Sequence, residues 1–402
     1  MRVIIDAIST DSGGGRRYFN GLLPALISSR KEWNFVILVK KGVSNGDSRN
    51  RNVAWIELPR MLCKFPLRLI TQQCAVPIVG RIARAQVVLS LSDVGPIWSP
   101  VPVLATVANA FIYRASSRCT GYRLSKADLP FLHRIRTRAL ALLSKLFLRS
   151  AKGLIFWTAA SRAEVESLTG KELPSMVIHN GEPFDSTESG EAYRLRKKNI
   201  VCVSTIVRYR NQLRLVRAFH ELLKSDTRCK EFSLLLIGSV CDGPYASSLR
   251  RFVAENKLEE YVHILGDIQY DRVEAYYAES WGLVFPSRVE TYGFPVVEAL
   301  FKDLPMAVSD IPAFRELAGS AAIYFDPTDV ESIKDGLKRL LWDDTLRERL
   351  VEAGKRQCLR YSWKTAALQT ARMIESALNL DGSERAREEN EGQCPETRWE
   401  NR

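Results

Sequence analysis

Short apolar runs alternate with longer stretches of helical periodicity along the first 180 residues. The runs are rich in β-branched residues, whereas the longer stretches repeat apolar side chains three and four positions apart. Strands that alternate with helices are typical of a parallel sheet covered on both faces. The predicted strands are 2–8, 33–39, 86–92, 101–108 and 152–158, and the predicted helices lie near 16–30, 130–149 and 160–169.

The same alternation resumes after a polar, charged interval. We assign 181–198 as a linker between a domain at 1–180 and a domain at 199–362. The pattern indicates an α/β protein with two doubly wound, Rossmann-like parallel-sheet domains that face each other across a cleft. The strands predicted for the second domain are 199–205, 232–238, 261–266, 281–285, 304–309 and 321–325, with helices between them and near 329–341 and 345–359.

The C-terminal end of the chain divides into two parts. A helix near 363–379 is predicted to pack back on the first domain. The polar and charged residues 381–402 are predicted to be disordered, because they offer little apolar surface to bury.

The segment PSRVETYGFPVVEAL at 286–300 carries the strongest chemical signal. A buried strand ends at its start, and Gly293, Phe294 and Pro295 follow as the opening of a helix. Free backbone N–H groups and the helix dipole make such a helix end a site for an anion. Glu290 precedes the helix and Glu298 lies one turn inside it, where carboxylates accept hydrogen bonds from sugar hydroxyls. The alternative is two surface glutamates near a turn.

This segment resembles the GT-B-fold retaining glycosyltransferases of family four, the glycosyltransferase group 1 that includes enzymes of bacterial surface polysaccharides. Glu290 and Glu298 match the two glutamates, with seven residues between them, that mark the family. The segments 309–333, 234–239, 263–268 and 177–182 are also similar to it. The resemblance implies that Glu298 holds the ribose hydroxyls of a nucleotide-sugar. It also implies that Glu290 lies near the sugar and the reaction centre, and that the backbone around Gly293 and Phe294 contacts the donor.

A basic loop at 203–219 is the second candidate for donor binding. It follows a strand that ends at Thr205 and precedes a helix, so Arg210 or Arg208 is placed to clamp a diphosphate. The family usually has an arginine at the position of Thr205 and a lysine at that of Arg210. We also assign Gly238, a glycine at the end of a strand, to the donor site by this resemblance.

Three glycines at 13–15 follow the first strand and are predicted to form a loop before a helix. Such turns allow backbone amides to approach a phosphate or substrate, although neither a dinucleotide motif nor a P-loop is present. Gly14 and Gly15 are the candidates on the acceptor side of the cleft. The family commonly has a histidine after the strand 101–108, whereas this chain has Ala108 and Asn109, and Asn109 is the candidate for a hydroxyl contact.

The net charge of +12 is concentrated in the first half of the chain. Residues 1–180 hold 26 Lys and Arg against 10 Asp and Glu, whereas the remainder is slightly acidic. A helix at 129–150 and the segment 60–84 both mix basic with apolar residues, a pattern of helices at an anionic membrane surface. An ordinary core helix with a charged outer face is the alternative. The predicted membrane contacts are Arg134, Arg138, Lys145 and Arg149.

Several classes of function are not supported. The eight cysteines form no C-x-x-C pair and the four histidines have no ligand spacing, so we expect neither a metal nor another cofactor. No apolar run is long enough to span a bilayer, and the start lacks a secretory h-region. No nucleic-acid motif accompanies the positive charge. We expect a cytoplasmic protein that associates peripherally with the inner membrane.

The function predicted from these observations is retaining transfer of a hexose, with mannose as the first choice. The donor is a nucleotide-sugar, and the acceptor is a lipid-linked or lipopolysaccharide glycan at the inner membrane face. Glu290 and Arg210 are the predicted catalytic residues. The alternatives are a nucleotide-sugar epimerase on the same fold and a non-catalytic protein that binds an anionic ligand.

Overall fold

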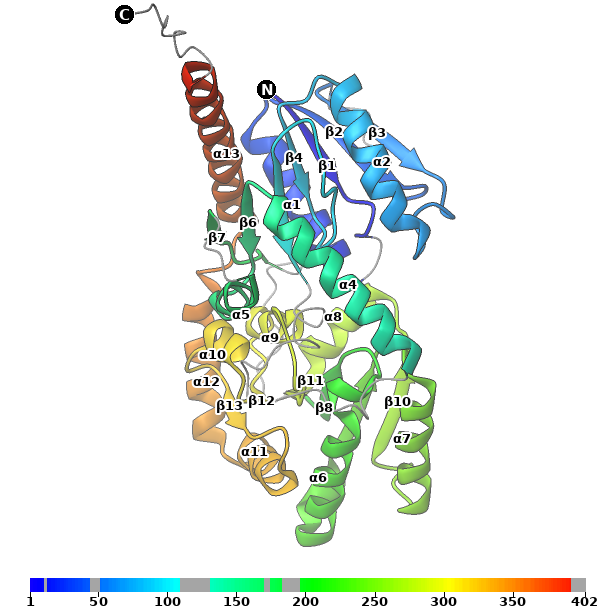
Figure 1. The fold of residues 1–402 in the computed structure, drawn as a ribbon. Coiled ribbons are helices and arrows are strands. Elements are labelled where there is room, and N and C mark those ends of the chain that lie inside the picture. Colours follow the sequence, from blue (N-terminus) through cyan, green and yellow to red (C-terminus); the bar gives the residue numbers. More distant parts are fainter. Residues whose placement is uncertain (11–12, 44–50, 109–130, 170–173, 183–195, 392–402) are drawn as a thin grey trace, which may run out of the picture.

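The computed structural model describes residues 1–10, 13–43, 51–108, 131–169, 174–182 and 196–391 of the 402 residues. Of these, 131–138, 168–169, 270–271 and 380–391 are described by their backbone alone. The described chain forms two α/β domains, each built on a parallel sheet, and this confirms the predicted fold class (Figure 1).

The first domain contains a seven-stranded parallel sheet in the order β3-β2-β1-β4-β5-β6-β7. Its central strands are buried almost throughout, since helices cover both faces and leave no room for polar side chains. The strands are β1 (Arg2–Asp6), β2 (Asn34–Lys40), β3 (Val53–Leu58), β4 (Val87–Ser90), β5 (Val103–Val107), β6 (Gly153–Phe156) and β7 (Ser175–Val177), and the helices are α1 (Gly13–Ser29), α2 (Leu67–Ile82), α4 (Phe131–Ser150) and α5 (Ala159–Thr169).

The sequence pattern missed β3 and β7, which are the two edge strands of this sheet. Neither has a buried residue in its span, and β7 has only three residues. An edge strand is half exposed and therefore carries a mixed pattern that resembles a loop. The pattern also gave no helix between β3 and β4, where the structure has α2.

The second domain contains a six-stranded parallel sheet in the order β10-β9-β8-β11-β12-β13. Every strand predicted for it is present, and β8 begins at Lys197, one residue before the predicted end of the linker. The strands are β8 (Lys197–Val203), β9 (Ser233–Ile237), β10 (Val262–Gly266), β11 (Ser280–Phe285), β12 (Met306–Ser309) and β13 (Ile323–Phe325), and the helices are η3 (Arg208–Arg210), α6 (Gln212–Ser225), η4 (Thr227–Glu231), α7 (Gly243–Glu255), α8 (Tyr270–Glu279), α9 (Phe294–Phe301), α10 (Pro312–Ala318), α11 (Val330–Trp342) and α12 (Asp344–Cys358).

The last helix, α13 (Trp363–Glu391), returns to the first domain and runs beside β6 (Figure 1). Its Ala367 and Ile374 are buried in the same hydrophobic cluster as Leu22 of α1. The backbone of this helix continues through 381–391, and 392–402 lie outside the described residues. Glu, Arg and Ala, which are frequent in this part of the chain, are strong helix formers.

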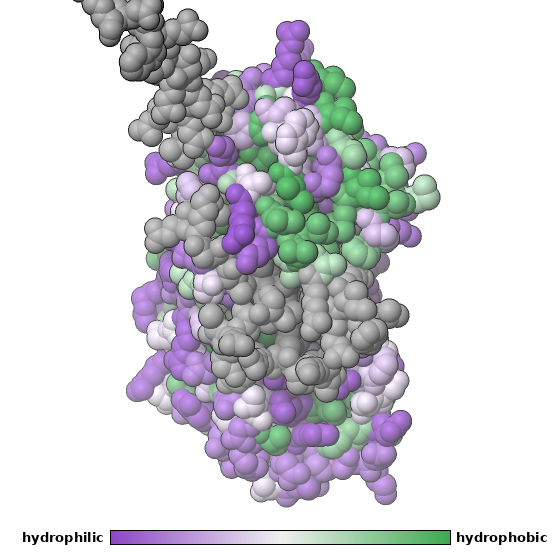
Figure 2. Space-filling view, in the orientation of Figure 1, coloured by the Kyte–Doolittle hydropathy of each residue, from purple (hydrophilic) through white to green (hydrophobic). Residues whose placement is uncertain are grey.

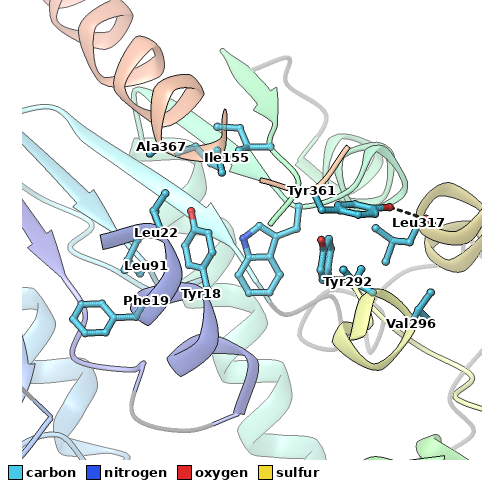
Figure 3. Close-up of a cluster of buried hydrophobic side chains, with 14 of the residues drawn as sticks. Tyr18, Phe19, Leu22, Leu91, Ile155, Tyr292, Val296, Leu317, Tyr361 and Ala367 are labelled. Carbon is cyan, nitrogen blue, oxygen red and sulfur yellow. Dashed lines mark hydrogen bonds between the residues drawn. The ribbon is translucent and has the colours of Figure 1, made fainter. Parts of the chain in front are cut away.

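One hydrophobic cluster joins the two domains at their interface. It contains Tyr18 and Leu22 of α1 together with Tyr292 and Val296 of the second domain (Figure 3). Tyr361, which lies between α12 and α13, donates a hydrogen bond of 2.6 Å to the carbonyl oxygen of Leu317 (Figure 3). The two sheets are therefore held in a defined relation at the base of the cleft.

Candidate active site

A cavity of about 1950 Å³ lies between the two domains. It is lined from both sides by residues at the carboxyl ends of the parallel strands, where open α/β sheets bind ligands. Ser9 and Ala108 follow β1 and β5 in the first domain, and Thr205, Gly238 and Glu290 follow β8, β9 and β11 in the second.

The N-terminus of α9 faces this cavity. Gly293 precedes the helix with a φ of 99°, a conformation that an L side chain rarely adopts. A Cβ at this position would also lie only 2.5 Å from the ring of Phe314. Gly293, Phe294 and Pro295 all line the cavity, as predicted for a helix end that receives an anion.

Glu290 forms an ion pair with Arg210 at the edge of this helix end. Nη1 of Arg210 also donates to Oγ of Ser287 at 3.3 Å. The guanidinium lies between aromatic rings, 5.2 Å from the centroid of Tyr209 and 5.8 Å from that of Phe285. Burial lowers the pKa of Arg210, but an arginine remains protonated in proteins. Arg210 is therefore a protonated group held in a fixed position at the cavity wall.

Glu298 is fully buried in α9 and forms an ion pair with Arg17 of α1, in the other domain. The guanidinium of Arg17 also lies 5.7 Å from the centroid of the Phe294 ring. Arg17 lines the cavity, whereas Glu298 does not. A carboxylate without access to water needs a countercharge, and here the first domain supplies it.

Sequence reasoning missed Arg17. It is the second residue after the three glycines, but an arginine near the start of a helix looks the same in sequence whether it faces solvent or a carboxylate. Only the approach of the two domains brings it to Glu298, a residue more than half the chain away.

The glycines at 13–15 open α1 and do not form a loop before it, so the predicted loop is wrong. Gly14 and Gly15 do line the cavity. A Cβ on Gly14 would lie 2.7 Å from the ring of Phe294, so the absence of a side chain lets α1 approach α9 closely. Ala108 also lines the cavity, and its N–H donates to Oδ1 of Asp93 at 2.9 Å. Asn109 lies outside the described residues.

Of the residues after β8 and β9 that were predicted to bind the nucleotide-sugar donor, some line the cavity and one does not. Thr205 and Gly238 line the cavity, and the carbonyl oxygen of Thr205 accepts a hydrogen bond from Nε2 of Gln212 at 2.8 Å. Arg208 does not line it, because its guanidinium lies over the ring of Tyr245, 5.7 Å from the centroid. Of the two arginines predicted to clamp a diphosphate, the structure thus brings only Arg210 to the cavity wall.

No group of three or more His, Cys, Asp or Glu that could hold a metal ion occurs among the described residues. The described cavity wall offers backbone N–H groups, arginines, carboxylates and hydroxyls, together with the thiols of Cys241 and Cys358.

The predicted membrane residues all lie on α4. Arg149 is exposed near the end of α4 and Lys145 is half-buried, while Arg134 and Arg138 lie in α4 where only the backbone is described. Leu142 and Leu146 are exposed on the same helix, and Ile70, Ile78 and Ile82 are exposed on α2. Figure 2 shows apolar surface over α2 and the adjoining part of α4. None of the helices, where described, is long and apolar enough to cross a bilayer.

Residues 186–357 match the protein family described as Glycosyl transferases group 1. The O-antigen chain mannosyltransferase RfbU of Salmonella typhimurium is 31% identical over 109 residues, which cover 27% of this chain and 30% of that protein. The O-antigen chain mannosyltransferase B of Escherichia coli is 29% identical over 161 residues, 40% of this chain and 42% of that protein. The aligned segments span less than half of these relatives. The family match confirms the resemblance predicted from the motifs.

Solved structures are similar to almost the whole chain. The glycosyltransferase WaaG, involved in lipopolysaccharide biosynthesis, aligns with a TM-score of 0.70 and 15% identity over 93% of this chain and 99% of its own. HepE of Anabaena, solved with UDP-glucose, aligns with a TM-score of 0.69 and 15% identity over 94% of this chain and 100% of its own. These similarities confirm the predicted fold with two facing domains.

Proposed function

We propose, from the premise that residues 186–357 form a glycosyl transferases group 1 domain within a GT-B fold, that this chain is a retaining hexosyltransferase. Its donor is a nucleotide-sugar and its acceptor is a lipid-linked or lipopolysaccharide glycan at the inner membrane face. One observation carries the proposal: the open end of α9, Glu290 and Arg210 meet on the wall of one cavity between the two domains.

The donor diphosphate binds at the N-terminus of α9 beside Arg210 in this proposal. Cleavage of the anomeric bond leaves negative charge on the nucleoside diphosphate, and the amides of the helix end and the guanidinium stabilise that charge where it develops. No metal is needed for this step. Docking of the two domains excludes water, which would otherwise hydrolyse the donor. Retention of the anomeric configuration is proposed from the family.

Glu298 exchanges its partner when the donor binds. Its carboxylate is now held by Arg17, which lines the cavity in front of the proposed ribose site. Ribose hydroxyls that donate to Glu298 take the place of this guanidinium, and Arg17 is then released toward the negatively charged diphosphate. Both interactions give the buried carboxylate hydrogen-bond partners, and the released guanidinium becomes a counterion of the diphosphate.

Mannose is the proposed sugar because the matched O-antigen relatives are named mannosyltransferases. The proposal of a lipid-linked acceptor rests on the exposed surface of α2 and α4 in the first domain. The exposed apolar side chains of α2 and α4 stand beside the exposed Lys64, Arg81 and Arg84, as expected for contact with an anionic membrane that carries the acceptor lipid.

Donor binding is tested by thermal shift with UDP-glucose, GDP-mannose and dTDP-glucose, followed by release of nucleoside diphosphate from the donor that binds. We expect one donor to raise the Tm and Glu298→Ala and Arg210→Ala to abolish the shift. Unchanged shifts in both folded variants would overturn the site. Conversion of the donor sugar to its epimer without acceptor would favour the epimerase, and binding without any turnover would favour the non-catalytic protein.

Membrane contact is tested by flotation with vesicles that contain phosphatidylglycerol. The wild type and Arg339→Glu, a charge reversal on the exposed face of α11 in the second domain, are expected to float. The double variant Ile82→Ser and Arg81→Glu is expected to stay at the bottom of the gradient. Equal flotation of all three, or equal binding to neutral vesicles, would contradict the proposed surface.

A further inference from the structure

The loop between β11 and α9, which carries Glu290, is anchored by the first domain. Oγ1 of Thr158 donates a hydrogen bond of 2.8 Å to the carbonyl oxygen of Thr291. The hydroxyl of Tyr292 donates to the carbonyl oxygen of Asn180 at 3.3 Å. All four residues are buried, so these bonds do not compete with water and the donors lose a partner if the bonds break.

Thr158 is itself held rigidly at the start of α5. Its Oγ1 accepts a hydrogen bond of 3.1 Å from the N–H of Ser161, the third residue of the helix, as an N-cap residue does. The N–H groups of Ala159 and Ala160 donate to the carboxylate of Glu316 in α10 at 2.7 and 3.1 Å. The first three amides of α5 are therefore all paired, two of them by the second domain.

The second domain holds the other side of the same loop. The N–H of Arg288 donates to the carbonyl oxygen of Tyr209 at 3.0 Å, and Ser287 accepts from Arg210. Glu290 lies between these anchors and the Thr158 bond, one residue before Thr291. The backbone that orients its carboxylate is thus fixed from both domains at once.

We infer that Thr158 is a positioning residue, which orients Glu290 through its hydrogen bond to the carbonyl of Thr291. The inference rests on the proposed function, in which Glu290 lies near the reacting sugar. Glu290 takes its working position only when the corner between β6 and α5 is docked on the loop. Docking of the first domain is therefore required for the chemistry as well as for binding the acceptor.

A positioning role and a purely structural role of Thr158 predict different effects on the reaction. The open end of α9 and Glu298, which bind the donor in the proposal, receive no hydrogen bond from Thr158. Loss of the hydroxyl should therefore disturb the reacting geometry more than donor binding, and a displacement of about 1 Å at a reacting group costs up to about a hundredfold in rate.

The experiment measures the kcat and KM for release of nucleoside diphosphate from the donor that passes the thermal-shift panel, with the full chain. We expect Thr158→Val to lower kcat about tenfold or more with a KM within about threefold of the wild type. Thr158→Ser keeps the hydroxyl and should restore kcat. The control is Thr370→Val in α13, where an equally buried hydroxyl makes no hydrogen bond and its loss should leave kcat unchanged.

Three results would overturn the inference: a folded Thr158→Val with a wild-type kcat, a Thr158→Ser as slow as Thr158→Val, or a kcat loss in Thr370→Val of the same size. If Thr158→Val does not fold, Tyr292→Phe removes the other cross-domain bond and should lower kcat alone, and an unchanged kcat there would overturn it as well. A wild type that neither binds nor cleaves any donor would instead refute the proposed function.

Discussion

The two carboxylates of the cleft, Glu290 and Glu298, are eight residues apart in one segment and are neutralised in different ways. Glu290 pairs with Arg210, which belongs to the same domain. Glu298 pairs with Arg17, which belongs to the other domain. The second domain can therefore preserve its Glu290–Arg210 pair by itself, whereas Glu298 is satisfied only while the two domains are together or while a ligand replaces Arg17.

The two domains also contribute different features to the cavity as a whole. The second domain supplies the open helix end and the fixed cation, both of which suit a donor diphosphate. The first domain supplies glycines that permit close approach, an exchangeable arginine, and an outer face with exposed apolar and basic residues. In the proposed function, one domain binds the leaving group, and the other brings the acceptor and completes the site.

We expect the largest effect from removal of the cation that the second domain contributes, Arg210. Arg210→Ala should lower turnover of the donor by about a hundred- to a thousandfold, because one preorganised charge at the leaving group is lost. Arg208→Ala is the matched control, since Arg208 lies over Tyr245 and does not line the cavity. Steady-state release of nucleoside diphosphate checks both, and an equal loss in the two variants would contradict the placement of Arg210.

The cross-domain pair is tested by its effect on stability. Arg17→Ala leaves Glu298 buried without its countercharge and should lower the free energy of unfolding by about 3 kcal/mol. Glu298→Gln in the same chain should restore most of that loss, because no charge is then left unpaired. Urea denaturation of the wild type, the two single variants and the double variant measures the coupling, and additive losses would show that the pair does not contribute.

The domains approach each other closely at Gly14, and a substitution there should cause a smaller loss of stability. Gly14→Ala places a methyl group against the ring of Phe294 and should cost about 1 to 2 kcal/mol, since overpacking displaces the ring at the open end of α9. Gly243→Ala at the start of α7 meets no atom within 4 Å and serves as the control. Thermal unfolding with and without donor distinguishes them, and a Gly14→Ala variant as stable as the control would argue against tight contact.

The smallest expected effect is a pH dependence at the domain interface. Burial lowers the pKa of His179 below its ordinary value near 6.5, while the carbonyl of Trp157 and the carboxylate of Glu316 act to raise it and Arg360 acts to lower it. Below about pH 6.5 the unfolded state binds a proton that the folded state does not, so stability falls as the pH falls.

The free energy of unfolding of the wild type should fall by about 1 kcal/mol or less as the pH is lowered. The fall should be smaller in His179→Gln, because the glutamine side chain does not titrate. Melting curves between pH 5 and 8 measure it. His220, whose pKa burial also lowers, contributes equally to both proteins and cancels in the difference. Identical pH profiles would exclude His179 as the source.

Much of the fold follows from local pattern. Interior strands such as β4 and β11 are mostly apolar and almost entirely buried between two layers of helices, and all the interior strands were predicted. The edge strands β3 and β7 were missed because half exposure removes that pattern.

The sequence by itself determined the two parallel sheets, the glycine and proline that open α9, and the spacing of Glu290 and Glu298, since each depends on residues within a few turns of chain. Only the tertiary structure decided that Arg17 pairs with Glu298, that Thr158 holds Thr291, and that Arg208 faces away from the cavity. These contacts join residues that are distant along the chain or depend on which face of a turn packs against a neighbour. Burial then selects them, because an interior charge or hydroxyl requires a partner wherever the fold provides one.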